Sequence, residues 1–439
     1  MIWPQKCFGG VRVMNAPSPA NVRRLTQGIM PMLRRMSSNG MTVDVQALQT
    51  IDRDLADEQS DLMFQIEGYR SEAHQVNLNS GKQLAELLFR ELGLDDTGLK
   101  RVKDKSRPKL DKKATAKLKE KHEVVRLYAE WKERQTIRTN FCQALPKQIH
   151  PDGKLHPHFQ TTRAATRRLA CEHPNLTQIP TRSKIGKRIR NAFRPSPGKT
   201  YVSVDQSQIE LRVIAHNSGD EQMIKQFYSA HDFHTQTAAL VFRVPIDEVD
   251  PETQRKPAKN MNFGVVYGIT PSGLLEQFIV SGALDWDLES CEALIADWFR
   301  VYGGVGNYID LEVRRAKAHL YLWDMWGGVR QFPELLSSDA YVRAKAEREI
   351  GNTSTQSGAQ GCMQLSMIEL WDLIDRERVF GDRRPEPLVQ IHDELLFEMD
   401  ETIVGDFIAL TQAVMNNCVR LEVPIESAAK SGVEWGKLE

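Results

Sequence analysis

The sequence predicts a mostly helical α+β fold. Residues 21–150 are helical in pattern. The stretch Tyr201-Val-Ser-Val-Asp205 is rich in β-forming residues, which indicates a strand that ends at the aspartate. Two apolar runs flank His392-Asp393-Glu394 and predict a tight hairpin with acidic side chains at its tip. With 439 residues, 41% of them hydrophobic, the chain is large enough for several packed subdomains.

In chain order the patterns indicate five parts. Residues 1–20 form an extension, residues 21–150 a helical part, and residues 151–219 a part with the first strand. Residues 220–335 form a second helical part, and residues 336–439 contain a helix and the hairpin. The formal net charge is zero, from 58 basic and 58 acidic residues. Within the first helical part, however, Lys100–Arg138 holds 15 basic and 6 acidic residues, net +9. Such a stretch is either a phosphate-contacting surface or a solvated helical face.

Four residues of the second helical part recur at four-residue intervals. Arg255, Lys259, Phe263 and Tyr267 would lie on one slowly drifting face of an α-helix. Two cations followed by two aromatic rings combine an anion clamp with a stacking platform. A nucleoside triphosphate, with its phosphates and flat base, has the matching parts.

The strand and the hairpin tip each present an acidic residue. Asp205 and Asp393 are 188 residues apart (393 − 205), so only the fold can bring them together. Two carboxylates with few other protein ligands suit Mg²⁺, which completes its coordination with water and substrate phosphates. Paired metal ions of this kind activate an attacking oxygen and stabilise a leaving one.

These patterns together resemble those of family A DNA polymerases, the DNA polymerase I-like enzymes. Asp205-Gln-Ser-Gln-Ile-Glu-Leu-Arg resembles that family's motif A, Arg255–Gly268 its motif B, and His392-Asp393-Glu394 its motif C. Further matches, in the order of the family, are Asn77–Leu84, Arg168-Leu169 with Pro174–Pro180, Asp232-Phe-His234, the set Arg348, Asn352 and Gln356, Val423-Pro424 and Gly432–Trp435. The resemblance extends from about residue 21 to the C-terminus.

The resemblance implies a right-hand polymerase fold, with a palm built on an antiparallel sheet, fingers and a thumb. In these terms residues 21–150 are the thumb with supporting helices, 151–219 and 336–439 are the two palm segments, and 220–335 are the fingers. Asp205 and Asp393, with the backbone carbonyl of Gln206, are expected to hold two Mg²⁺ ions, for which Mn²⁺ can substitute. Asp205, Asp393 and Lys259 are the expected catalytic residues.

The same resemblance assigns the substrate contacts. The expected dNTP-binding residues are Arg255, Lys259, Phe263, Tyr267, His234, Glu210 and Gln208. Among them, Glu210 is expected to block the space of a ribose 2′-hydroxyl. The expected DNA-binding residues are Arg168, Arg182, Arg348, Asn352, Gln356, His392 and Glu394. Contacts of Arg168, Arg348 and Gln356 with minor-groove acceptors would test base-pair geometry without reading sequence.

The implied function is template-directed DNA synthesis in replication or repair. Expected partners are primer–template DNA, dNTPs, and a separate exonuclease or processivity factor. We expect a monomer. We expect it in the cytoplasm of a bacterial or virus-infected cell, because no run approaches the ~20 apolar residues that a membrane span needs. About 20 residues precede the resemblance, fewer than the ~50–250 of a domain, so no 3′–5′ exonuclease or 5′ nuclease is expected in this chain.

The sequence departs from the family at several positions. Gln206 follows Asp205 where the bacterial enzymes commonly have Tyr, and Arg167 stands where Gly is common beside Arg168. Thr177-Gln178 replaces a common Gln-Asn. Three alternatives to DNA-templated DNA synthesis remain: a single-subunit RNA polymerase, reverse transcription as a side reaction, and a non-catalytic DNA-binding protein. Comparing dNTP with NTP incorporation separates the first, and Asp393→Ala separates the last.

Overall fold

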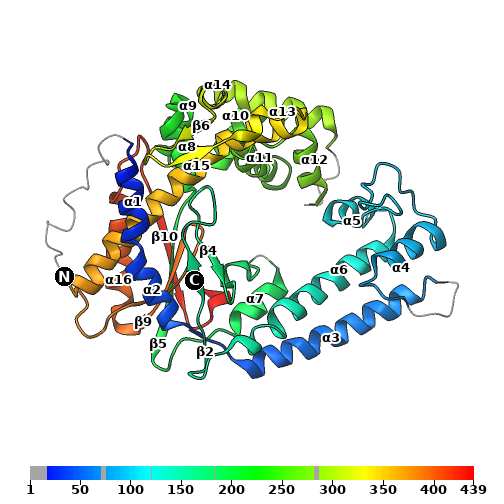
Figure 1. Ribbon diagram of the computed structural model, residues 1–439, viewed down its shortest axis with the longest axis horizontal. Coiled ribbons are helices and arrows are strands. Elements are labelled where there is room, and N and C mark those ends of the chain that lie inside the picture. Colours follow the sequence, from blue (N-terminus) through cyan, green and yellow to red (C-terminus); the bar gives the residue numbers. More distant parts are fainter. Residues whose placement is uncertain (1–16, 71–75, 120, 182, 281–285) are drawn as a thin grey trace.

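The computed structural model describes residues 17–70, 76–119, 121–181, 183–280 and 286–439. They form a central sheet region, a helical lobe above it and a long arm that extends to one side (Figure 1). The predicted mostly helical α+β class is confirmed by this arrangement.

The central sheet is antiparallel throughout, with strand order β10-β5-β9-β8. Its strands are β5 (Lys199–Gln206), β8 (Glu386–Ile391), β9 (Glu394–Asp400) and β10 (Ser427–Gly432). Strand β5 therefore continues one residue beyond the predicted end, and the hairpin predicted around His392 and Asp393 is the β8–β9 connection. Two-stranded pairs are formed by β1 (Met41–Thr42) with β2 (Lys154–Leu155), β3 (His158–Gln160) with β4 (Ala170–Glu172), and β6 (Tyr321–Trp323) with β7 (Val329–Gln331).

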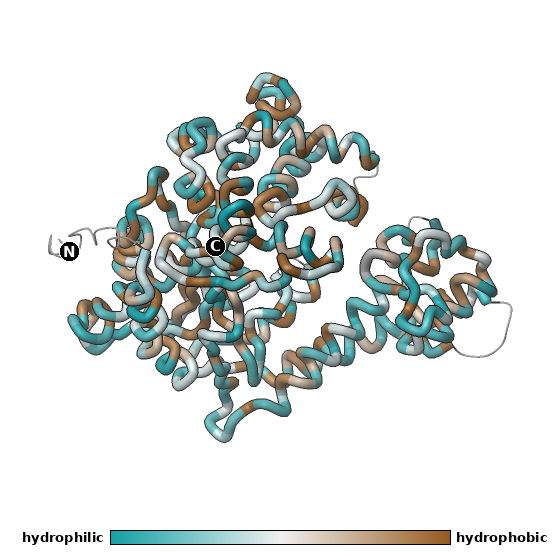
Figure 2. Tube along the Cα trace, turned by 45° about the horizontal axis from the view of Figure 1, so that its top comes forward, coloured by the Kyte–Doolittle hydropathy of each residue, from teal (hydrophilic) through white to brown (hydrophobic). Residues whose placement is uncertain are grey.

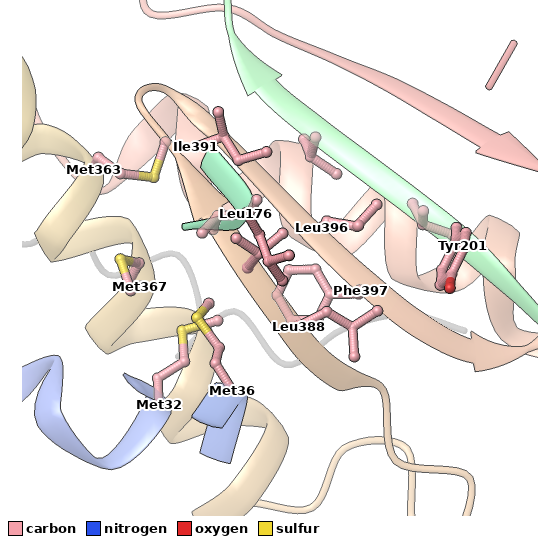
Figure 3. Packing of buried hydrophobic residues seen from close by; sticks show 14 of the residues in the cluster. Met32, Met36, Leu176, Tyr201, Met363, Met367, Leu388, Ile391, Leu396 and Phe397 are labelled. Carbon is pink, nitrogen blue, oxygen red and sulfur yellow. The ribbon is translucent and has the colours of Figure 1, made fainter. Parts of the chain in front are cut away.

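Helices of the central region support the sheet. They are α1 (Pro19–Gly28), α2 (Met30–Asn39), α7 (Lys184–Asn191), α15 (Ala340–Trp371) and α16 (Val404–Asn417). Helix α2 packs on β8, and α16 packs on β5 and β10. Unbranched methionines fill the space beside the sheet: Met32 and Met36 from α2 meet Met363 and Met367 from α15, next to Leu388 and Phe397 of the strands (Figure 3).

The arm consists of α3 (Val45–Glu67), α4 (Gly81–Ala85), α5 (Lys112–Lys119) and α6 (Glu123–Ile137). Helices α3 and α6 lie side by side along its length (Figure 1). Hydrophobic and hydrophilic residues alternate along these helices (Figure 2), as expected for elements with one buried stripe. The arm has a hydrophobic cluster of its own, which includes Leu62, Leu88, Leu127 and Trp131.

The helical lobe consists of α8 (Ile209–Ser218), α9 (Glu221–Phe227), α10 (Phe233–Phe242), α11 (Lys256–Val266), α12 (Pro271–Val280), α13 (Leu288–Val301) and α14 (Gly303–His319). A second large hydrophobic cluster, with Phe278 and Trp298 fully buried, holds these helices together. The tip of the lobe contacts the tip of the arm, because α12 packs against α5 (Figure 1). The clusters of lobe and arm are distinct from the one around the sheet, but α3 and α8 also contribute to the sheet cluster, with Leu48 and Ile51 from α3 and Ile209 and Val213 from α8.

Candidate active site

The two aspartates predicted to act together meet at one edge of the central sheet. Asp205 lies near the end of β5, opposite Glu394 of β9, and Asp393 lies in the β8–β9 turn directly before that residue. The Gln206 N–H donates to the Asp393 carbonyl over 2.9 Å, which fixes the turn against the strand. Glu394 accepts a hydrogen bond from the Ser203 hydroxyl over 2.6 Å. The sheet register thus joins residues that are 188 positions apart in the chain.

Both aspartates are destabilised in their charged form. Burial raises the pKa of Asp205 to about 7, and the nearby Asp393 and Glu394 carboxylates add to the effect. Burial also raises the pKa of Asp393 to about 6, with Glu210 and Glu394 contributing. Among the described residues no Lys or Arg nitrogen lies within 4.0 Å of either carboxylate.

This donor set fits divalent cations. Two carboxylates that repel one another, with no basic partner among the described residues, are stabilised when cations bind between them. The described residues contain no group of three or more His, Cys, Asp or Glu side chains arranged to hold a metal. Water and a ligand with oxygen donors would therefore have to complete the coordination, as Mg²⁺ commonly requires.

The predicted cationic helix is present, with a change at its start. Arg255 belongs to a π-helical turn, Pro251–Arg255, because its N–H bonds to Asp250, five residues back. Helix α11 then carries Lys259, which is exposed, and Phe263, which is half-buried. Arg255 itself has helical backbone angles, φ −64° and ψ −42°, and continues directly into α11, so the four-residue spacing is kept. Its guanidinium pairs with Asp232 over 3.0 Å and with the Thr235 hydroxyl over 3.1 Å. The common face of the four side chains stays a prediction.

His234 is a buried member of a polar network in the helical lobe. It is 3% exposed, and the Asn262 side-chain amide donates to its Nδ1 over 3.0 Å. Asn262 in turn accepts from the Trp298 indole N–H over 2.7 Å. The pKa of His234 is lowered to about 4, mainly by burial; Asp232 opposes this shift, and the positive charges of Lys259 and Arg255 contribute to it, so the ring is neutral at pH 7. Its ring lies 5.6 Å from that of Phe263.

Glu210 joins two predicted groups of site residues. Its carboxylate accepts a hydrogen bond from the Tyr267 hydroxyl and forms an ion pair with Arg168. Burial and the Glu210 charge raise the pKa of Tyr267 to about 12, so its hydroxyl keeps the proton that it donates. Arg168, predicted to contact DNA, and Tyr267, predicted to contact the nucleotide, thus share one anchor.

Helix α15 also borders this region, where it packs against α8 and α11. Arg348, Asn352 and Gln356 lie on it at the predicted four-residue spacing. Gly268, directly after α11, has φ +66° and lies so close to this helix that a Cβ would stand 2.9 Å from the Arg348 Cβ and 3.0 Å from its carbonyl oxygen. Only glycine adopts this conformation at so close an approach without strain, so α11 ends directly against α15.

These elements surround a cleft of about 1310 Å³. Nine of the predicted site residues line it: Arg168, Gln208, Glu210, Lys259, Phe263, Tyr267, Gln356, His392 and Asp393. The other predicted residues of the described part are not among those that line it: Asp205, Gln206, His234, Arg255, Arg348, Asn352 and Glu394. Arg182 lies outside the described residues. The structure therefore brings acidic, cationic and aromatic side chains to one cavity.

Several residues of this region were not predicted from the sequence. Asn260 of α11 and Glu276, Gln277 and Val280 of α12 line the cleft, and only their proximity to Arg255–Gly268 in the chain could have indicated this. Lys430 of β10, whose charge acts on Asp205, has no local sequence signal because it reaches the site through strand pairing.

The fold and the cleft define the class of protein. The sequence pattern of DNA polymerase family A matches residues 45–437, and the chain belongs to this family. The resemblance found in the sequence is thereby confirmed.

Individual relatives agree. Thermostable DNA polymerase I sequences of Thermus caldophilus and Thermus aquaticus are 35% and 33% identical over 410 and 419 residues, 92% and 94% of this chain. These alignments cover 46% and 48% of the relatives, so the chain spans about half their length. The POL domain of Pol1 from M. smegmatis, solved in complex with DNA primer-template and dNTP, is similar with a TM-score of 0.84 and 32% identity, over 93% of this chain and 70% of that one. The predicted right-hand fold is confirmed by this likeness.

Among the described helices, none combines the length and apolar character needed to cross a bilayer. The predicted localisation, the monomeric state and the absence of nuclease activity stay predictions.

Proposed function

We propose that this chain is a DNA-directed DNA polymerase that adds dNTPs to a primer 3′ end, with two bound Mg²⁺ ions, in replication or repair. One observation carries the proposal: the sheet register joins Asp205 to Asp393 at the edge of a cleft whose other wall carries Lys259, Phe263 and Tyr267. A cation-binding pair facing a cation and two aromatic rings suits a nucleoside triphosphate held between metal and protein charges. The complex of the M. smegmatis relative with primer-template and dNTP supports the same assignment.

In this proposal the arm is the thumb, the helical lobe the fingers, and the central sheet the palm. Bound metal ions would lower the pKa of the primer 3′-hydroxyl and stabilise the departing pyrophosphate. Asp205 and Asp393, with the Gln206 carbonyl, would hold those ions. Lys259 would neutralise charge on the triphosphate, and Phe263 would stack beside base and sugar.

The remaining predicted residues would bind the nucleotide and the DNA and would select the correct sugar. Arg255 would give up its Asp232 partner for a terminal phosphate, to which it can present two N–H donors. His234 is neutral and enclosed, so we assign it the support of Phe263 as well as a contact to the triphosphate after a rearrangement. Glu210, held in place by Arg168 and Tyr267, would exclude the ribose 2′-hydroxyl. Gln208, His392, Glu394 and the polar face of α15 would contact substrate or primer–template.

Extension of a labelled primer–template with Mg²⁺ tests the proposal. Parallel reactions contain dNTPs or NTPs, and matched or 3′-mismatched primers. We expect templated addition of dNTPs, little addition of NTPs, and no shortening of the mismatched primer. Preferential NTP addition would favour the RNA polymerase alternative, whereas DNA binding without any extension would favour the non-catalytic one. Shortening of the mismatched primer would contradict the expected lack of a 3′–5′ exonuclease.

A further inference from the structure

Arg167 occupies an unusual backbone position for its residue type. Its φ is +60°, in the left-handed region that favours glycine, and its side chain is only 12% exposed. A non-glycine residue is strained in this region, because its Cβ comes too close to the following carbonyl oxygen. Burying a guanidinium adds a further cost unless the charge is paired. An arginine in this position therefore needs contacts that offset both costs.

Those contacts come from two separate elements. Nη2 of Arg167 lies 2.6 Å from Oδ2 of Asp324, which follows β6, and donates to the backbone carbonyl of Ser357 in α15 over 2.9 Å. The Asp324 side chain in the pair is 6% exposed. A single guanidinium thus connects the 161–169 loop, the β6–β7 hairpin and α15.

The hairpin is itself fixed by the same aspartate. Oδ1 of Asp324 accepts from the backbone N–H groups of Trp326 and Gly328, each over 2.9 Å. The Trp326 indole N–H donates to the Gly358 carbonyl over 2.9 Å. Asp324 is therefore a rigid acceptor that is attached to α15, and the pair transmits this rigidity to Arg167.

Each end of this connection is next to a residue that lines the cleft. Arg167 directly precedes Arg168, and Ser357 directly follows Gln356. The Arg167 contacts therefore set the distance between the backbone that carries Arg168 and the backbone that carries Gln356. Both side chains face the same cavity, from a loop on one side and a helix on the other.

We propose that Arg167 is a positioning residue: its contacts with Asp324 and Ser357 hold Arg168 and Gln356 at the spacing with which they test the base pair at the primer end. The inference rests on the proposed polymerase function and goes beyond it, because it names a determinant of mismatch discrimination that does not touch the substrate. One nitrogen, Nη2, makes both contacts, while Nε and Nη1 are buried without a hydrogen-bond partner among the described residues. Lysine is a poor replacement, since its ammonium ends a flexible chain, whereas the planar guanidinium holds Nη2 in a fixed direction.

The test compares Arg167→Gly, Arg167→Lys, Asp324→Asn and the double variant Arg167→Gly/Asp324→Asn with wild type. Single-turnover extension is measured from a matched and a 3′-mismatched primer, well below the melting temperature of each variant. We expect the matched-to-mismatched ratio to fall about tenfold in Arg167→Gly and Asp324→Asn, with no further fall in the double variant, because coupled residues are not additive. Arg167→Lys should recover only part of the ratio.

Arg35→Ala is the matched control. Arg35 forms an ion pair with Glu386, away from the cleft-lining residues, so its loss should lower stability without changing the ratio. A ratio within twofold of wild type in Arg167→Gly would overturn the inference while leaving the polymerase proposal intact. Failure of the wild-type protein to extend any primer would overturn both, so the two failures are distinguishable.

Discussion

Asp205 and Asp393 lie on a sheet, whereas Arg255 and Lys259 lie on or beside a helix that belongs to a different hydrophobic cluster. The carboxylates are buried and have raised pKa values, with no described basic partner. Lys259 is exposed, and Arg255 already has a partner in Asp232. One side of the cleft is thus fixed by the sheet and has no described basic partner in ion-pair contact, and the other carries a solvated lysine and an arginine that is already paired.

The difference assigns separate tasks to the two sides. A strand register cannot slip without moving every side chain to the opposite face, so the sheet holds its acids at a constant separation. A helix with its own core can move as a unit toward a bound ligand, as closing elements do in many enzymes. We therefore expect substitutions on the acidic side to remove chemistry and substitutions on the cationic side to weaken binding and closure.

The largest effect is expected for Asp393→Asn. Loss of one carboxylate removes a charge that cations need, and primer extension should fall by about a thousandfold or more. Asp382→Asn, a fully exposed carboxylate before β8, is the control and should extend at the wild-type rate. Comparable rates for both variants would refute the metal assignment.

A smaller effect is expected for Lys259→Ala. Removing one positive charge from the triphosphate contact should lower kcat/KM for dNTPs by about a hundredfold. Steady-state kinetics would check this, with Lys225→Ala, an exposed lysine of α9, as the matched control. If both lysine variants lost the same activity, the effect would be one of general charge and not of position.

Glu210→Ala should change selectivity more than rate. The carboxylate is held by Arg168 and Tyr267, so its removal leaves space beside the sugar and frees both neighbours. The preference for dNTPs over NTPs should fall about tenfold or more, as measured by the ratio of their kcat/KM values. Glu221→Ala, in the first turn of α9, is the control, and an unchanged ratio for Glu210→Ala would exclude the steric role.

The smallest expected effect concerns stability without metal. The folded-state pKa of Asp205, about 7, is above its usual value of 3.8, so the folded protein binds the proton more tightly than the unfolded chain does. The Asp205 carboxyl therefore lowers the free energy of unfolding as the pH rises from about 4 to 7. In EDTA, Asp205→Asn should raise the free energy of unfolding by on the order of 1 kcal/mol at pH 8 and by almost nothing at pH 4.

Thermal melts at the two pH values measure that difference, and the same variant should lack polymerase activity. Asp382→Asn again serves as the control, because its side chain is fully exposed. Equal melting temperatures of wild type and Asp205→Asn at pH 8 would mean that the carboxylate is not destabilised by its surroundings.

The sequence predicted those features that local patterns determine. The β-forming run before Asp205 corresponds to β5, and the apolar runs around Asp393 correspond to β8 and β9. The four-residue spacing of Arg348, Asn352 and Gln356 corresponds to α15. Each of these signals lies within one element or one hairpin, where residue type and periodicity decide the backbone conformation.

Contacts between elements could not be read in this way. The Arg168–Glu210 pair spans 42 positions and the Tyr267–Glu210 contact spans 57, and both depend on how loop and helix pack. The π-helical turn before α11 is capped by Asp250, whose side chain accepts hydrogen bonds from the N–H groups of Glu252 and Thr253. The pairing of Arg255 with Asp232 likewise depends on how α11 and the turn before it pack against α10.

The strand order of the central sheet has a consequence for biosynthesis. Strand β5 is inner, and both of its neighbours, β9 and β10, are made long after it. At roughly 5–20 residues per second, the ribosome needs about 10–40 s between Asp205 and Asp393. During that interval the apolar stretch Tyr201–Val204 has two unpaired edges, a state prone to association with other chains. We therefore expect the nascent strand to need protection by early helical packing or by a chaperone, and the two aspartates cannot meet until the hairpin has emerged.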